Sequence, residues 1–368
     1  MSSTLVVADL HVGDRARADV LRREGVAGPL LDAVDRIDRV VLLGDSLELR
    51  NRPASEALAA AEPFFRALGE ALAGKPVVIL AGNHDHALVE RFLARNDEPL
   101  GLEQRFSPKK ASDLAVKLAE QFGPHADVQF AYPGVWLRED VYAMHGHYLD
   151  VHMTVPTLER LSIAASGRLA LDHSRPWNAV FSVDEYETLL APVYAWSFAA
   201  AQSGRPGQGP AGAAAGRMWD TLRSKRSGGL RAQALAAGFP LAVAALNAAG
   251  LGPLRSELTR AELRQAGLRA MSEVVERLRI RARHVLFGHT HRTGMLEGDR
   301  EPEWLTPNGV QLHNCGSWVY SNTFLADGDP ASAYWPGGAI LIEDGTPPQL
   351  LRLLATHVAA ELSASPTA

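Results

Sequence analysis

Short runs of apolar residues recur near the start of the chain, and each run ends in polar residues. Leu5–Ala8, Asp38–Leu43 and Pro76–Leu80 have the length and the branched aliphatic content of buried strands. The segments between them, 15–36 and 54–73, carry leucine, valine and alanine at helical spacing. This alternation predicts parallel strands with helices packed outside them.

Further strand-like runs follow later in the chain, and most of them lie near its end. Residues 86–122 predict helices with an irregular, proline-containing middle, and Val128–Met144 predicts strands with a turn at Pro133 and Gly134. The strand pattern returns at Val285–Phe287. Three more apolar runs then predict strands at Val310–Cys315, Ala339–Ile342 and Leu350–Leu354.

The region between these two groups differs in character, because it has helical patterning, several aromatic residues and few strand signals. Within it, Gly204–Gly216 is rich in glycine, alanine and proline and predicts a loop. We therefore expect 1–150 and 281–358 to form one discontinuous domain and 151–280 to form an inserted, mostly helical cap. The cap carries basic residues that either form a solvated helix face or clamp a phosphate: Arg217, Arg223, Lys225, Arg226 and Arg231.

Composition narrows the class of protein. The 368 residues are 46% hydrophobic and 21% charged, as in a soluble globular protein. The net charge of −5 argues against an indiscriminate nucleic-acid binder. Because Cys315 is the sole cysteine, neither a disulfide framework nor a thiolate zinc site is available. This, together with the apolar strand at the start in place of a leader peptide, predicts a cytoplasmic protein.

One uncharged stretch, Ala232–Leu254, is long enough to span a membrane. It is dominated by alanine and interrupted by Pro240, Asn247 and three glycines. These residues favour a buried or interfacial helix over a transmembrane span, and they leave peripheral membrane contact open.

Metal-ligating residue types follow five of the predicted strands. In the last block, Gly288-His289-Thr290-His291, two histidines two residues apart point to the same side of the chain. A single block of this kind is usually a turn or a core residue, but repeated enrichment at five strand ends predicts a metal site. The blocks are Asp9 and His11; Asp45; Asn83, His84 and Asp85; His145 and His147; and His289 and His291.

The donor types indicate which metals would bind. Carboxylates and imidazoles with one amide oxygen suit Mn, Fe or Zn better than Ca or Mg. Asp45 is the best-placed carboxylate to bridge two cations. Two divalent cations can clamp the attacking and leaving oxygens of an in-line displacement and generate hydroxide near neutral pH. This arrangement suits the hydrolysis of a phosphoester.

The five blocks, in this order, resemble the signature of the calcineurin-like metallophosphoesterase superfamily. The resemblance covers roughly 1–150 and 283–355 and leaves out the insertion. It implies an α/β fold, specifically a four-layer α/β/β/α sandwich, in which the discontinuous domain is catalytic. Asn314–Trp318 is also similar to a stretch common near the C-terminus of the family, with Cys315 as a small buried residue.

The resemblance also implies roles for individual residues. One metal would be held by Asp9, His11, Asp45 and His291, and the other by Asp45, Asn83, His145 and His289. A hydroxide that bridges the metals would attack phosphorus. His84 would protonate the leaving oxygen or stabilise its charge, Asp85 would orient the His84 imidazole, and His147 would lie behind the metal ligands.

Several residues near these blocks remain open. Glu48 and Arg50 could face a substrate or cap a helix. Four further histidines could line the site, although the sequence does not require it: His86, His152, His173 and His313.

The leading hypothesis is a dinuclear-metal phosphoesterase that hydrolyses a phosphomonoester, phosphodiester or pyrophosphate bond in a phosphorylated small-molecule or lipid-linked substrate. The alternative is a lipid-precursor hydrolase similar to the UDP-2,3-diacylglucosamine pyrophosphatases, whose lid has a similar position. Tyr186–Ala201 and Ala232–Leu254 could then receive an acyl chain, or they could form the cap's own core. A nuclease is disfavoured by the acidic balance. A non-catalytic scaffold is disfavoured because His84 and every ligand type are present.

Overall fold

The computed structural model describes residues 3–363, apart from 156, 171–175, 204–240, 256–259, 323 and 326–327. The chain divides into two compact units. The first contains Met1–His147, Ala201–Gly204 and Ile280–Ala368, and the second contains Tyr148–Ala200 and Arg205–Arg279. The predicted loop after residue 204 and the basic residues between 217 and 231 lie outside the described residues.

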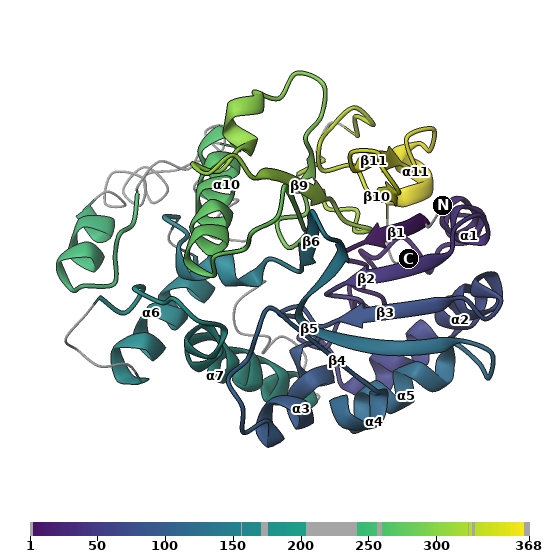
Figure 1. The fold of residues 1–368 in the computed structure, drawn as a ribbon, viewed down its shortest axis with the longest axis horizontal. Coiled ribbons are helices and arrows are strands. Elements are labelled where there is room, and N and C mark those ends of the chain that lie inside the picture. Colours follow the sequence, from purple (N-terminus) through teal and green to yellow (C-terminus); the bar gives the residue numbers. More distant parts are fainter. Residues whose placement is uncertain are drawn as a thin grey trace, which may run out of the picture. The chain divides into compact units, whose positions relative to one another are not determined.

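The first unit begins with the predicted alternation of strands and helices. Strands β1 (Ser3–Val7), β2 (Arg39–Leu43) and β3 (Pro76–Leu80) pair in parallel, as Figure 1 shows. Helices α1 (Gly28–Asp35) and α2 (Ala54–Leu72) connect them. All four residues after the first of each strand are buried, which explains why the strands appear as apolar runs instead of alternating patterns. The three strands and the second helix are confirmed.

The prediction of one helix over 15–36 is wrong, because only Gly28–Asp35 is α-helical there. The preceding residues form turns, and the backbone N–H of Val20 donates to the carbonyl of Trp318 at 3.0 Å. This bond to a distant segment takes a donor that a continuous helix would use locally. The tertiary contact therefore replaces the helix that local propensity favours.

Strand β5 (Asp127–Arg138) joins the two halves of the sheet. Its first part pairs in parallel with β3, and its second part pairs antiparallel with β6 (Val141–Met144). The turn predicted at Pro133 and Gly134 is therefore wrong. At Gly134 an added Cβ would lie 2.0 Å from the hydroxyl of Tyr142, so this glycine permits a close side-chain approach instead of a reversal of the chain.

The remaining strands complete a mixed α/β fold with one large sheet. The order is β11-β10-β1-β2-β3-β5-β6-β7-β9-β8, with β4 paired to β5. Strand β4 (Glu103–Phe106) lies in the irregular middle of the segment 86–122, where no strand was predicted. The other bounds are β7 (His284–Phe287), β8 (Thr293–Gly294), β9 (Gln311–Cys315), β10 (Gly338–Glu343) and β11 (Gln349–Arg352), with helices α3 (Glu90–Arg95), α4 (Pro108–Ala111) and α5 (Asp113–Gln121).

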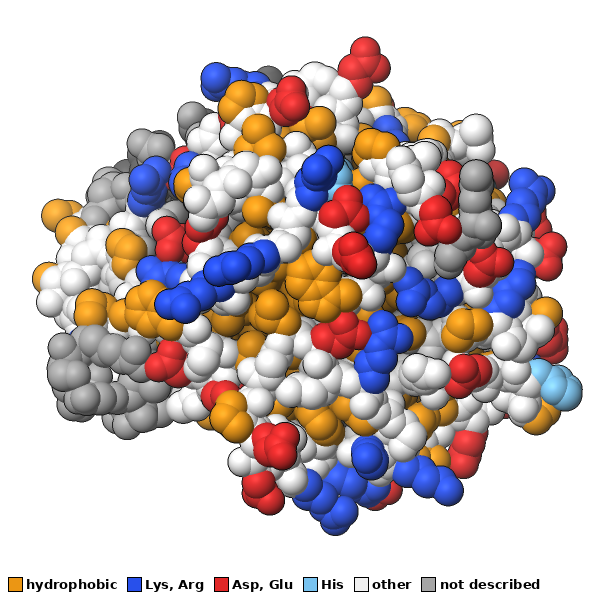
Figure 2. All heavy atoms as spheres, viewed as in Figure 1, with side chains coloured by type: hydrophobic (Ala, Val, Ile, Leu, Met, Phe, Trp, Pro, Cys, Tyr) orange, Lys and Arg blue, Asp and Glu red, His pale blue; other side chains and the backbone are white. Residues whose placement is uncertain are grey.

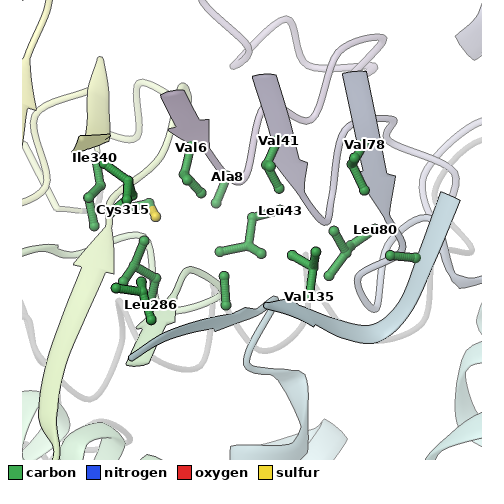
Figure 3. Close-up of a cluster of buried hydrophobic side chains, with 14 residues drawn as sticks. Val6, Ala8, Val41, Leu43, Val78, Leu80, Val135, Leu286, Cys315 and Ile340 are labelled. Carbon is green, nitrogen blue, oxygen red and sulfur yellow. The ribbon is translucent and has the colours of Figure 1, made fainter. Parts of the chain in front are cut away.

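A cluster of buried aliphatic side chains takes members from both halves of the sheet (Figure 3). Cys315 belongs to this cluster, and burial raises the pKa of its thiol, which agrees with a packing role and no chemistry. The labelled members are Val6, Ala8, Val41, Leu43, Val78 and Leu80 together with Val135, Leu286, Cys315 and Ile340. Well-packed strands give the loops at their ends a rigid base.

The described part of the second unit contains helices and no strand. The helices are α6 (Leu158–Ala170), α7 (Val183–Gln202), α10 (Arg260–Arg277) and a helical segment over 241–248. Among the described residues of the chain, no helix is both long enough and apolar enough to cross a membrane. Much of the uncharged stretch Ala232–Leu254 lies outside the described residues.

Candidate metal centre

The predicted ligands are brought together by loops that leave the carboxyl ends of β1, β2, β3, β6 and β7. These five strands are mutually parallel or joined through β5, so their ends meet at one edge. Three groups of side chains there have ligand atoms within 4.8 Å of one another: Asp9, His11 and His291; His11, Asp45 and His84; and Asp45, His145 and His289.

The first group has three ligand atoms that converge. Nε2 of His11 lies 3.0 Å from Nε2 of His291. Oδ1 of Asp9 lies 3.3 Å from Nε2 of His291 and 3.8 Å from Nε2 of His11. This oxygen is fully buried and has no hydrogen-bond partner within the described residues. Two imidazole nitrogens and an orphaned carboxylate oxygen fit a transition-metal cation.

The third group, Asp45, His145 and His289, is joined by the amide of Asn83. Nε2 of His145 lies 3.3 Å from Oδ2 of Asp45 and 3.2 Å from Oδ1 of Asn83. The same amide oxygen lies 3.0 Å from Nδ1 of His289. Oδ2 of Asp45 is also 3.6 Å from Nε2 of His11, in the first group. Asp45 therefore lies between the two groups, as expected of a bridging carboxylate.

Backbone strain is concentrated at these residues. Of the eight non-glycine residues with positive φ in the described chain, five are candidate ligands. Left-handed φ costs about 1–2 kcal/mol for a residue that bears a side chain, so this concentration indicates loops shaped for a function instead of local preference. The angles are 55° at Asp9, 46° at His11, 51° at Asp45, 64° at His289 and 57° at His291.

Three glycines allow the ligand groups to approach the backbone closely. An added Cβ would lie 2.4 Å from Nδ1 of His145 at Gly44, and 2.2 Å from Oδ1 of Asp45 at Gly82. At Gly288 it would lie 2.2 Å from Oδ2 of Asp9. Each glycine directly precedes a candidate ligand, so the strand-end motifs require glycine for space as well as for turning.

Glu48 belongs to the site. Its Oε2 lies 2.7 Å from Nδ1 of His84 and 3.2 Å from Nδ1 of His11, and the residue is only 4% exposed. Burial alone would raise its pKa, but the neighbouring His84 and His11 hold the pKa well below the usual range. The carboxylate thus anchors Nδ1 of both rings and leaves Nε2 of each for another partner. From the sequence, Glu48 could face a substrate or cap a helix. Its position three residues after Asp45 was a signal that it belongs to the site.

Asp85 has a different role from the expected one. Its carboxylate accepts backbone N–H groups from Gly82 at 2.7 Å, Asp45 at 3.2 Å, Ser46 at 2.7 Å and Leu47 at 3.2 Å. The expectation that it orients the preceding imidazole is therefore wrong, because it ties the second and third ligand loops together. Burial, and then the charge of Asp45, raise its pKa to about 6.

His145 has a fixed tautomer and an altered pKa. Its Nδ1 donates to the carbonyl of Leu43 at 2.9 Å, which leaves Nε2 facing the site. Burial alone would lower its pKa, but the carboxylates of Asp45 and Asp9 raise it to about 9. The imidazolium that results pairs with Asp45, whose pKa is held well below the usual range against the effect of burial. A cation would replace that proton.

His147 lies beside His145, and its place behind the metal ligands stays a prediction. Its ring centroid is 5.5 Å from that of His145, and its Nε2 is 3.4 Å from the hydroxyl of Tyr132. Burial, reinforced by the charge of His145, lowers its pKa well below the usual value. The ring of His86 lies 6.5 Å from that of His147, so both rings belong to the surroundings of the site.

The other histidines left open do not join the three groups. His313, on β9, lies 3.1 Å from His284 of β7. His152, in the second unit, bonds the hydroxyl of Tyr186 at 2.6 Å. His173 lies outside the described residues.

The end of β9 and the segment after it support two ligand loops. The amide of Asn314 donates to the carbonyl of Gly288 at 3.1 Å and to the hydroxyl of Thr290 at 2.9 Å. The backbone N–H of Trp318 donates to the carbonyl of Asp9 at 3.0 Å. These bonds hold the strained backbone of the loop after β1 and of the loop after β7 in position.

One comparison with known proteins, the match to a family model, agrees with this geometry. A family model described as calcineurin-like phosphoesterase matches residues 2–189, which include the ligand loops through His145. No curated protein matches. One similar solved structure is a cold-active protein-tyrosine phosphatase of a psychrophilic Shewanella species, at 14% identity and a TM-score of 0.29. The match covers 94% of this chain and 76% of that one, and a likeness this weak supports no conclusion.

Proposed function

We propose, because this chain belongs to the calcineurin-like phosphoesterase family, that it hydrolyses a phosphoester bond with the help of two divalent cations. The observation that carries the proposal is the position of Asp45 between two groups of convergent ligand atoms. Carboxylate, imidazole and amide donors of this kind suit Mn, Fe or Zn.

The distances support the ligand sets that the family resemblance implies. Asp9, His11 and His291 with Asp45 would hold one cation. Asn83, His145 and His289 with the same Asp45 would hold the other. When bound, such cations supply a hydroxide nucleophile at neutral pH and stabilise the charge that develops on the phosphoryl oxygens.

His84 is the residue that would act on the leaving group. Its side chain is 29% exposed, so it is accessible from the solvent side of the site, and Glu48 holds its Nδ1 at 2.7 Å. Nε2 then remains as the atom that can give a proton to the leaving oxygen. Glu48 is a positioning residue for this step, and its contact with His11 ties the ring to the first cation site.

We also propose the family's four-layer α/β/β/α arrangement for the catalytic domain, 1–150 and 281–358, with 151–280 as a helical cap. The aliphatic cluster between the sheet halves supports the two inner layers. The helices α6, α7 and α10 support a helical insertion. A phosphorylated small molecule is the substrate class that fits the family.

A lipid-linked substrate is the second candidate. Two large apolar side chains on helices of the second unit are exposed, Trp196 by 57% and Leu241 by 75%. Exposed apolar side chains on a helix can receive an acyl chain. Hydrolysis of a lipid-linked pyrophosphate at a higher kcat/KM than its deacylated analogue would favour this candidate, and equal values would remove it.

The direct test is hydrolysis of bis(p-nitrophenyl) phosphate and p-nitrophenyl phosphate after chelation and after reloading with Mn²⁺. We expect activity only in the reloaded protein. His84→Ala should retain its metals and lose activity by about 10²–10⁴-fold, whereas His125→Ala, at an exposed position, should behave as wild type. A metal-loaded wild-type protein without activity on either ester would contradict the proposal, and an unaffected His84→Ala rate would remove the role of this residue.

A further inference from the structure

Two histidines on neighbouring strands contact each other at a distance from the candidate metal centre. His284 is the first residue of β7, and His313 is the middle residue of β9. Nδ1 of His284 lies 3.1 Å from Nε2 of His313, and the ring centroids are 5.2 Å apart. The candidate ligands His289 and His291 follow the opposite end of β7, beyond about 10 Å of strand. The contact is therefore separate from the three ligand groups.

The register of the sheet brings the two rings to the same face. Strands β7 and β9 are parallel, and Leu286 lies opposite His313. Because side chains alternate along a strand, His284 points to the same face as Leu286 and lies diagonal to His313. Leu286 is fully buried in the aliphatic cluster, so both histidines stand beside a packed core. Strands of this kind hold a pair of side chains more rigidly than loops do.

The separation of the two nitrogens suits a shared transition-metal ion. Imidazole nitrogens bind Zn²⁺ at about 2.0–2.1 Å, so two of them lie about 3.3–3.4 Å apart at a tetrahedral angle and about 2.9 Å apart at a right angle. The 3.1 Å between Nδ1 of His284 and Nε2 of His313 falls within this range. A hydrogen bond between the rings spans the same distance. An ion could therefore replace the shared proton with little movement of either strand.

Both rings are suited to bind a cation at neutral pH without losing charge. Burial, and then the charge of His284, lower the pKa of His313 to about 4. Burial also lowers the pKa of His284, although the carboxylate of Asp140 opposes this effect. In a neutral imidazole, the proton of the nitrogen that binds the metal moves to the other ring nitrogen. No proton has to leave this pair, in contrast to His145.

The charges around the pair indicate which cations would bind. The carbonyl of Asp140 accepts the backbone N–H of His284 at 2.9 Å, so a carboxylate lies near the pair. Arg138 donates to both oxygens of that carboxylate, at 2.6 and 3.2 Å, and Arg283 adds a further positive charge near His284. With imidazoles as the direct ligands, hard cations such as Mg²⁺ and Mn²⁺ gain little, whereas Zn²⁺, Ni²⁺ and Cu²⁺ bind imidazole well.

We propose that His284 and His313 form an accessory site for one transition-metal ion of the Zn²⁺, Ni²⁺ and Cu²⁺ class, with water completing the coordination. The ion would join β7 to β9 and stabilise the folded chain by binding to it alone. This site does not depend on the proposed function, because neither histidine belongs to the three ligand groups.

Counting bound ions tests the accessory site. Full-length protein would be dialysed to equilibrium against Zn²⁺ or Mn²⁺ at the same free concentration. We expect the wild type to bind one more equivalent of Zn²⁺ than of Mn²⁺, and His284→Gln and His313→Gln each to lose that equivalent. His125→Gln, at an exposed position outside the pair, should keep it. No extra Zn²⁺ in the wild type, or an extra equivalent that survives in both variants, would overturn the proposal.

The two rings can also be observed in the wild type, which keeps the test valid if a variant fails to fold. Long-range ¹H–¹⁵N spectra of ¹⁵N-labelled protein report which nitrogen of each ring bears a proton. The rings are assigned by their contact with each other and by the loss of signals in a folded variant. With Zn²⁺, we expect Nδ1 of His284 and Nε2 of His313 to bind metal and the opposite nitrogens to bear the protons. Signals that stay unchanged in excess Zn²⁺ would overturn the proposal.

The results distinguish failure of this site from failure of the proposed function. In Mn²⁺, His284→Gln and His313→Gln should hydrolyse phosphoesters at the wild-type rate, because the accessory site is not used. If the wild type hydrolyses no phosphoester but both variants lose one Zn²⁺ equivalent, the proposed function fails while the accessory site stands. If hydrolysis is found and the signals of both rings do not move with Zn²⁺, the accessory site fails alone.

Discussion

His145 in the first unit and His152 in the second are both largely buried, yet their pKa values move in opposite directions. At His145, the carboxylates of Asp45 and Asp9 outweigh burial and raise the pKa to about 9. At His152, burial is reinforced by the charges of Arg277 and Arg160, and the pKa falls to about 3. The first imidazole is held in an anionic setting, and the second is held neutral in a cationic one.

The difference extends to the surroundings of the two rings. Around His145, carboxylate and imidazole groups face one another on strained loops, and Oδ1 of Asp9 has no partner within the described residues. Two hydrogen-bonded pairs of largely buried side chains lie in the second unit: His152 bonds Tyr186 at 2.6 Å, and the hydroxyl of Tyr148 donates to Glu187 at 2.5 Å. Figure 2 shows that charged and apolar side chains are mixed on one face of the molecule. This surface pattern does not reveal the ligand groups around His145 or the hydrogen-bonded pairs of the second unit. Ligand atoms that converge on a carboxylate oxygen without a hydrogen-bond partner mark a site for a ligand, whereas isolated hydrogen-bonded pairs mark structural contacts.

The largest effect is expected at the shared carboxylate. Asp45→Ala should lose both cations and reduce activity by about a thousandfold or more, because both sites share its oxygens and the charge stabilisation disappears. Glu187→Gln, at a buried carboxylate of the second unit, should retain both cations. Metal analysis of the purified variants checks this. Two stoichiometric metals in Asp45→Ala would contradict the bridging role.

A single methyl group should distinguish the ligand loops from the rest of the first unit almost as clearly. Gly82→Ala places a Cβ 2.2 Å from Oδ1 of Asp45, so we expect about 3 kcal/mol of destabilisation together with weakened metal binding. At Gly28 an added Cβ meets nothing within 4 Å, and Gly28→Ala should be neutral or slightly stabilising. Denaturant unfolding with and without Mn²⁺ measures both. If Gly82→Ala is as stable as the wild type, the loop accommodates the added methyl group and the predicted steric conflict with Asp45 is wrong.

Metal affinity should depend on pH through His145. Below its pKa of about 9, the metal-free ring is protonated, and the proton must leave when a cation binds. Affinity should therefore rise by up to about tenfold per pH unit between pH 6 and 8. In the metal-free protein the stability from this proton is fully present below the ordinary pKa of 6.5 and is lost as pH rises through 9.

Calorimetry in buffers of different ionisation enthalpy would measure the released proton. His152, neutral throughout this range because its pKa is about 3, should contribute nothing. Removing it with His152→Gln should therefore leave the slope unchanged. A slope of zero in the wild type would show that no proton leaves on metal binding, so that the His145 ring is already neutral in the metal-free protein.

The smallest effect is expected in the second unit. Tyr186→Phe removes the hydrogen bond to His152 and should lower the free energy of unfolding by about 1 kcal/mol, with metal content unchanged. Thr188→Ala, at an exposed position of the same helix, is the control. Thermal unfolding at fixed metal concentration measures the loss of stability. Loss of metal from Tyr186→Phe would contradict the idea that the hydrogen bonds of the second unit are structural and do not affect the metal centre.

Much of the first unit could be predicted because its strands are local apolar runs. Strands buried on both faces have a continuous pattern that needs no partner to be recognised, as at 39–43 and 76–80. The segments that were mispredicted depend on distant contacts. The loop before α1 bonds to Trp318, and β4 forms only because β5 lies beside it. Periodicity carries no information on such partners.

The same division holds within the candidate site. The sequence alone determined which residue types follow the strands, because aspartate, asparagine and histidine after an apolar run can be recognised in each block separately. Only the tertiary structure decided the hydrogen bonds among them. Glu48 rather than Asp85 holds the imidazole of His84, and Asp85 instead binds the backbone of two loops. Spacing specifies which strand end a side chain follows, but differences of about 1 Å in loop geometry select its partner.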